Sequence, residues 1–183
     1  LASAMVTLGR QCGVNTRALL TDMNVPLGRA AGNWLEVKES IECLDGHGPD
    51  DLRELVLTSA AHLLVQTGKA VSLEDGCKQA AECLASGAPR RKWDEMLKAQ
   101  GADLVAFHRK LQRDHTAPSV VELKAERDGF VTCCDARLIG EVIRDLGGGR
   151  LTKESVVNHD VGVDQMKKPG EPVKTGAVLV RIH

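Results

Sequence analysis

The sequence predicts an α/β fold with a C-terminal α+β subdomain of half-barrel type, and three observations support this prediction. A short apolar segment between two helical patterns near the N-terminus indicates a helix, a strand and a second helix in succession. A run of further helical patterns follows, up to Gln112. From Pro118 onward, short apolar stretches alternate with glycine and proline turns. We therefore place a boundary within Asp114–Pro118, which divides the chain into residues 1–115 and 116–183.

The first helix is expected over Leu1–Cys12, because apolar residues recur on one face and Gly13 follows as a left-handed cap. The segment Thr16–Thr21 has a short apolar centre between turn-forming residues, which favours a buried strand. Since the chain opens with Leu1 inside a helical pattern, we expect it to be a piece of a longer protein.

The stretch Thr21–Leu44 combines a glycine-bearing loop with a helix. Asn33 is a candidate N-cap, and Glu36 has the spacing of a capping box. Gly28 and Gly32 let the backbone before the helix approach another group closely. The helix has one apolar stripe, formed by Trp34, Val37, Ile41 and Leu44, and its other face is polar, with Glu36, Lys38, Glu39, Ser40 and Glu42.

Four more helices and then short strands are expected. The helices start near Pro49, Ser72, Pro89 and Asp103, and the first of them is apolar enough to be central to a core. Val120–Ala125 and Phe130–Cys133 flank Asp128-Gly129, which is typical of a β-hairpin. A helix over Ala136–Leu146, a glycine triplet and short strands from Val156 onward complete the chain.

Composition argues against two classes of partner. The 183 residues carry a net charge of −1, with acidic and basic residues interspersed, so we expect neither nucleic acid nor a membrane surface. No stretch is apolar enough to span a bilayer, and no signal peptide is recognisable. The six cysteines show no C-x-x-C spacing of a zinc or redox site. Most lie beside apolar residues, which favours reduced, buried thiols and a cytoplasmic location.

The run LLTDMNVPLGRAAGNWLEVKESIECLDGHGPDDL resembles the signature segment of the thymidine and pyrimidine-nucleoside phosphorylases, and the similarity continues to the end of the chain. It implies that residues 1–115 are part of the α/β phosphorylase domain and that residues 116–183 are the family's C-terminal subdomain. It also implies a pentosyltransferase that splits pyrimidine nucleosides with phosphate in nucleoside salvage. Such enzymes work as homodimers and use phosphate as co-substrate with no organic cofactor.

The resemblance implies two kinds of site residue in this chain. The main-chain oxygens of Leu27 and Ala30 and the side chain of Glu39 match ligands of a cation, which would be potassium, sodium or calcium. From spacing alone, Glu39 fits a solvated helix residue better. Met5 matches a position that lines the base pocket, although a methionine at this spacing is more typical of a core. The family's phosphate loop and base-holding residues precede Leu1, so the stretch alone is predicted to be inactive, with no catalytic residue of its own.

Two alternative functions remain open from the sequence. The ending MKKPGEPVKTGAVL resembles a biotinyl or lipoyl carrier domain, in which Lys167 would be the modified residue. Lys168 stands where such carriers have a methionine, which argues against it. A non-catalytic α/β interaction domain is the other alternative. The histidines are scattered, and the spacing of no pair is typical of a metal site.

Overall fold

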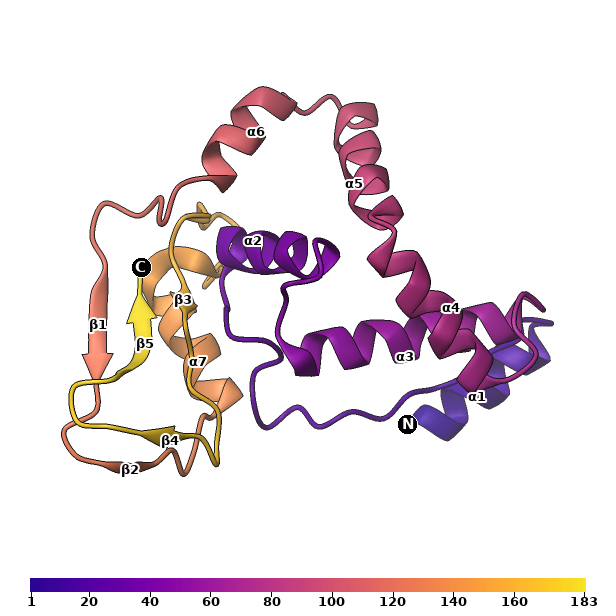
Figure 1. The fold of residues 1–183 in the computed structure, drawn as a ribbon, viewed down its shortest axis with the longest axis horizontal. Helices are drawn as coiled ribbons and strands as arrows, with labels where there is room; N and C mark the ends of the chain where they lie inside the picture. The colour runs from indigo at the N-terminus through magenta and orange to yellow at the C-terminus, as the bar shows by residue number, and fades with distance from the viewer. The chain divides into compact units, whose positions relative to one another are not determined.

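The computed structural model describes residues 1–183 and contains helices and short strands in the order shown in Figure 1. Its helices are α1 (Ala2–Gln11), α2 (Asn33–Leu44), α3 (Asp50–Gln66), α4 (Leu73–Ala85), α5 (Ala88–Ala99), α6 (Leu104–Leu111), α7 (Ala136–Ile143) and the π-helical turn η1 (Arg144–Gly148). Its strands are β1 (Val121–Lys124), β2 (Gly129–Phe130), β3 (Val163–Asp164), β4 (Pro172–Val173) and β5 (Val178–Ile182). The mixture of helices and small sheets agrees with the predicted α/β class.

The chain forms two compact units. Unit 1 consists of residues 1–22 and 54–82, and unit 2 consists of residues 23–53 and 83–183. Unit 1 holds α1, most of α3 and most of α4, and its buried apolar residues are the small Ala61, Ala70 and Ala80. The larger buried side chains, such as Ile41, Met166 and Val163, all belong to unit 2.

The first helix is confirmed, and the strand after it is not. Helix α1 is followed by Gly13 at a φ of 76°, as expected for a left-handed cap. The predicted strand Thr16–Thr21 is wrong, because residues 14–23 have no regular structure. A strand requires hydrogen bonds to a neighbouring strand, and the sheets of this chain are built only from residues 121–182.

Helix α2 starts as predicted but is capped differently. Gly32 is the N-cap residue, and its amide donates to Glu36 Oε1 at 2.9 Å. Asn33 lies inside the helix, where its side-chain amide donates to the Gly148 carbonyl at 3.2 Å. The Glu36 carboxylate therefore provides an acceptor for the backbone N–H of the N-cap residue. The Asn33 side chain instead links α2 to the end of η1.

The four middle helices are confirmed, with one correction. Helix α3 was expected to be central to a core, but Ala61 is its one buried residue. Helix α6 begins after Asp103, whose carboxylate accepts from the amides of Val105 and Ala106. It packs on α2, with the rings of Phe107 and Trp34 edge to face at a centroid distance of 5.7 Å.

The predicted hairpin between β1 and β2 is wrong, because each strand pairs with the C-terminal part of the chain. β1 and β3 flank β5 in an antiparallel sheet, while β2 pairs with β4 in a second one. Asp128 bonds to Lys174 Nζ and to the amide of Thr175, so the turn after β1 packs against the turn after β4. The pairing of β1 with β5 and of β2 with β4 replaces the hairpin. The spacing of residues within 120–133 does not reveal pairing with strands so far along the chain.

Candidate functional site

The loop Pro26–Gly32, here called the glycine loop, is held by three parts of unit 2. Ala31 and Val163 exchange backbone hydrogen bonds of 2.9 and 2.8 Å, which attach the loop to β3. The Met166 amide donates to the Arg29 carbonyl at 3.1 Å. On the opposite side, α2 and the start of α3 contribute the carboxylates described next. The loop therefore joins the phosphorylase-like signature segment to the C-terminal strands.

Gly28 allows Glu39 to lie directly against the loop. Its φ is 69°, and a Cβ added there would lie 2.1 Å from Glu39 Oε2. Only glycine leaves the space that the carboxylate occupies. The Arg29 amide donates to Glu39 Oε1 at 2.7 Å, so the carboxylate faces the backbone of the loop.

Glu39 is not a solvated helix residue, since its exposed fraction is 8%. Burial raises the pKa of its carboxyl, and the nearby charges of Asp51 and Glu42 act in the same direction. The hydrogen bond from Arg29 and the charge of Lys168 lower it in part. A buried carboxylate with so little compensation favours an additional positive charge beside it.

Three of the predicted site residues come together. Leu27, Ala30 and Glu39 line one cavity of about 480 Å³ in unit 2, together with residues of α2, α7 and η1. Met5 belongs to unit 1 and is 60% exposed on α1, so it is not the core residue that its spacing suggested.

The donor set suits a hard cation. The structure contains no group of three or more His, Cys, Asp or Glu side chains that could hold a metal ion. One carboxylate and the carbonyls of a tight loop are instead the oxygen ligands that alkali and alkaline-earth cations take. Leu27, Ala30 and Glu39 all border the same cavity. The residues present thus fit a cation of this class.

Sequence reasoning missed four side chains that hold the glycine loop. The Gly28 amide donates to Asp51 Oδ2 at 3.1 Å, and Lys168 Nζ donates to the Pro26 carbonyl. The Arg29 guanidinium donates to the Met166 carbonyl at 2.8 Å and pairs with Glu171. Asp51 fits the first turn of a helix, and Lys168 and Glu171 lie far along the chain, so no local pattern connects them to the loop.

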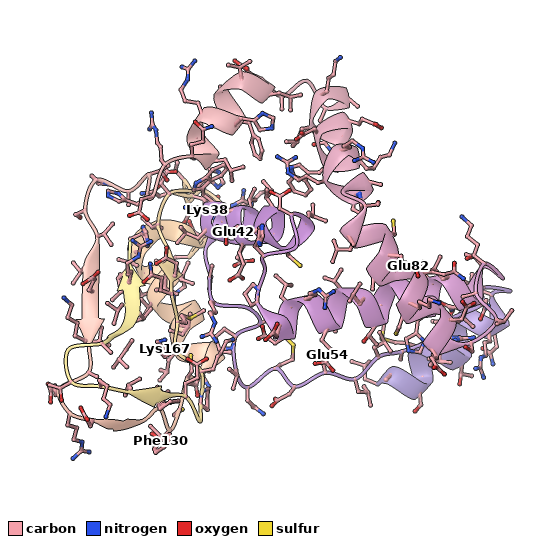
Figure 2. The ribbon with its side chains drawn as sticks, viewed as in Figure 1. Lys38, Glu42, Glu54, Glu82, Phe130 and Lys167 are labelled. Carbon is pink, nitrogen blue, oxygen red and sulfur yellow. The ribbon has the colours of Figure 1, made fainter.

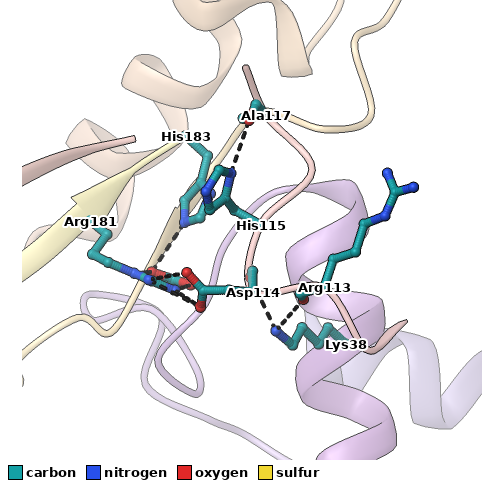
Figure 3. Close-up of polar contacts among 8 residues, drawn as sticks. Lys38, Arg113, Asp114, His115, Ala117, Arg181 and His183 are labelled. Carbon is teal, nitrogen blue, oxygen red and sulfur yellow. Dashed lines mark hydrogen bonds and ion pairs between the residues drawn. The ribbon is translucent and has the colours of Figure 1, made fainter. Parts of the chain in front are cut away.

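A second polar cluster joins the predicted boundary segment to β5, as Figure 3 shows. Arg181 pairs with Asp114 at 2.9 Å and with Asp164 at 2.6 Å. The buried ring of His183 lies 3.1 Å from Asp164, and Lys38 Nζ donates to the Asp114 carbonyl at 3.2 Å. Arg181 has two carboxylate partners and Lys38 bonds to backbone carbonyls, so the cluster links these elements to one another.

The cysteine prediction holds only in part. All six thiols are free, but only Cys43 is buried, while Cys12, Cys77, Cys83 and Cys133 are exposed. No helix has the length and hydrophobicity needed to cross a membrane.

Comparisons with known proteins agree with the resemblance of the signature segment. Residues 1–90 match the glycosyl transferase family a/b domain, and residues 130–183 match the pyrimidine nucleoside phosphorylase C-terminal domain. Pyrimidine-nucleoside phosphorylases of Staphylococcus aureus strains USA300, NCTC 8325 / PS 47 and N315 are each 42% identical over all 183 residues. The two domain matches and these relatives support the assignment of the chain to the pyrimidine-nucleoside phosphorylase family.

The chain covers 42% of the length of these phosphorylases and is itself covered completely. The match to the phosphorylase C-terminal domain includes Lys167, so the carrier-domain alternative is not favoured. Lys167 lies in the ordered segment between β3 and β4, where its amide donates to the Leu179 carbonyl at 2.8 Å.

Proposed function

We propose that the protein containing this chain is a pentosyltransferase that splits pyrimidine nucleosides with phosphate into free base and (deoxy)ribose 1-phosphate. The observation that carries this proposal is the 42% identity over every residue of the chain to proteins named pyrimidine-nucleoside phosphorylase. The glycine loop of the signature segment, with Glu39 buried against Gly28, is consistent with the same assignment.

We propose that this chain carries no catalytic group of its own. Phosphorolysis needs a phosphate cradle and donors that stabilise charge on the departing base. We therefore expect the 183 residues alone to bind neither substrate productively. The test is an assay of phosphate-dependent cleavage of thymidine and uridine by the purified 183-residue chain. Cleavage is monitored by the change in absorbance when the base is released. Measurable turnover would contradict the proposal that the catalytic groups lie outside this chain.

The part that we assign to this chain is a structural cation site. Leu27 O, Ala30 O and the Glu39 carboxylate would hold potassium, sodium or calcium, and the ion would supply the positive charge that the buried carboxylate lacks. Its role would be to fix the loop between α2 and the C-terminal strands. The lining of one cavity by all three residues supports this proposal.

Glu39→Gln tests the cation site, because it keeps the shape and removes the charge. We expect the intact wild-type protein to gain melting temperature on titration with potassium or calcium chloride, since a ligand of the folded state stabilises it. The variant should lose most of that gain while remaining folded. Glu42→Gln, on the exposed side of the same helix, is the matched control and should respond like wild type. Identical cation responses of Glu39→Gln and wild type would remove Glu39 from the site.

We further propose a homodimer in the cytoplasm. Large apolar side chains that remain exposed, such as Leu8 on α1 and Leu63 on α3, support coverage by additional protein. Six free thiols, several of them exposed, suit a reducing compartment. Sedimentation velocity of the intact protein tests the dimer, and a monomer at micromolar concentration would contradict it.

A further inference from the structure

Lys168 brings a positive charge to the glycine loop from the far end of the chain. Its side chain is 15% exposed, and Nζ donates to the Pro26 carbonyl and lies 3.3 Å from Asp51 Oδ2. The same carboxylate oxygen of Asp51 accepts from the Gly28 amide. Lys168 thus contacts Pro26 directly and Gly28 through Asp51, and these two residues flank Leu27, one of the proposed cation ligands.

The charges around the loop do not cancel. Glu39 and Asp51 contribute two carboxylates, and Lys168 contributes one ammonium group. The Arg29 guanidinium is neutralised by Glu171. Near the loop, this leaves one net negative charge. Glu42 and Lys167, which Figure 2 labels, are two further charges of opposite sign that offset each other.

We propose that Lys168 determines which charge of cation the glycine loop accepts, so that the site selects a monovalent ion over a divalent one. This inference rests on the cation site proposed above. A monovalent ion neutralises the loop, whereas a divalent ion leaves one uncompensated positive charge. Uncompensated charge in a partly buried site is unfavourable. Removing Lys168 leaves two net negative charges, which a divalent ion neutralises.

The difference in ionic charge makes the effect measurable. Repulsion between the ammonium group and the ion doubles when the ion carries two charges, and over several ångströms in protein one unit charge changes an affinity by about tenfold or more. A lysine is suited to this role because its four-carbon stem reaches the loop from a different segment.

The decisive experiment compares Lys168→Gln with wild type in the intact protein. Melting temperature and isothermal calorimetry are followed with potassium chloride and calcium chloride, at an ionic strength held constant with choline chloride. We expect calcium affinity to rise about tenfold or more in the variant and potassium affinity to rise by a smaller factor, because the lost repulsion is half as large for a monovalent ion. Lys167→Gln is the matched control, because this neighbour is 40% exposed and lies 3.9 Å from Glu171. It should keep the wild-type preference. An unchanged ratio of calcium to potassium affinity in Lys168→Gln would overturn the inference.

Two further variants keep the test decisive if Lys168→Gln unfolds. Lys168→Gln combined with Asp51→Asn restores one net negative charge and should regain the monovalent preference. Asp51→Asn alone neutralises the loop and should weaken calcium binding more than potassium binding. An equal loss for both ions would overturn the inference. Glu39→Gln separates the two proposals: if it abolishes cation binding while Lys168→Gln leaves selectivity unchanged, the cation site stands and the role of Lys168 fails.

Discussion

At the scale of single residues, the site depends on a glycine at position 28, where any side chain would collide with Glu39. Gly28 has a left-handed backbone, and Glu39 Oε2 fills the place of its Cβ. Both the positive φ and the lack of room for a Cβ atom therefore favour glycine at this position. Gly46, which also has a positive φ of 87°, has no atom within 4 Å of its Cβ position. Substituting each of the two glycines therefore distinguishes the free-energy cost of the positive φ from the cost of the steric contact.

We expect Gly28→Ala to destabilise the protein by about 3 kcal/mol, because it adds a close contact to the strain of a positive φ. Gly46→Ala should cost about 1 kcal/mol, from the strain alone. Urea unfolding of both variants measures the difference. Gly28→Ala should also lose its cation response, because the new methyl group displaces Glu39. Equal costs for the two substitutions would contradict the close approach.

At the scale of elements, the C-terminal sheet is fastened to the segment before β1 by ion pairs. Asp164 on β3 and Arg181 on β5 are 16% and 12% exposed, and Arg181 also pairs with Asp114. Burial by itself would raise the pKa of Asp164, but the hydrogen bond from Arg181 and the contact with His183 outweigh it and lower that pKa. The pKa of Asp114 is lowered mainly by the same arginine.

The lowered pKa of Asp164 predicts the direction of an acid effect. A carboxylate whose folded pKa lies below its unfolded value, about 3.9, stabilises the fold above that value. This stabilisation is lost as the pH falls through the folded pKa. Melting temperatures between pH 7 and pH 2 should therefore fall less steeply for Asp164→Asn than for wild type. A variant curve parallel to that of wild type throughout would contradict this role.

Asp164→Asn should also cost about 2 kcal/mol at pH 7, because Arg181 loses a partner in a partly buried place. The exposed pair of Lys92 and Glu95, with side chains 76% and 64% exposed, supplies the control. Glu95→Gln should change stability by less than about 0.5 kcal/mol. Denaturant unfolding of the two variants compares these values, and a similar small change in both would show that the Asp164 pair is effectively solvated.

At the scale of the whole molecule, the two units differ in what they bury. Unit 1 buries only small alanines, and α1 has no buried residue. Unit 2 buries Ile41, Val163 and Met166 almost completely. The family matches, to residues 1–90 and 130–183, lie on either side of the proposed domain boundary at 115 and 116. The boundary segment itself belongs to unit 2.

Hydrogen exchange should reveal this difference in the 183-residue chain. We expect amides of α1 to exchange at least about tenfold faster than those of α2 and β5, because local opening costs little where few apolar contacts are lost. Mass spectrometry of peptides from each segment measures the rates. Equal protection of α1 and α2 would show one cooperative unit.

The sequence by itself determined the local elements of this protein. Helical periodicity and capping residues located the helices, and the glycines at positions 13, 28 and 32 lie at positive φ as the turns require. The motif around Asn33 also pointed to the family, since it is a contiguous string that needs no folding to be recognised.

Only the tertiary structure decided which distant segments meet. β1 pairs with β5 and not with its neighbour β2, and residues 14–23 form no strand. Lys168 contacts the glycine loop although it is more than 130 residues away in the sequence. Glu39 is buried although its neighbours on the helix are polar. The physical reason is that periodicity encodes which residues share a face of one element, whereas pairing and burial depend on the surfaces that other elements present.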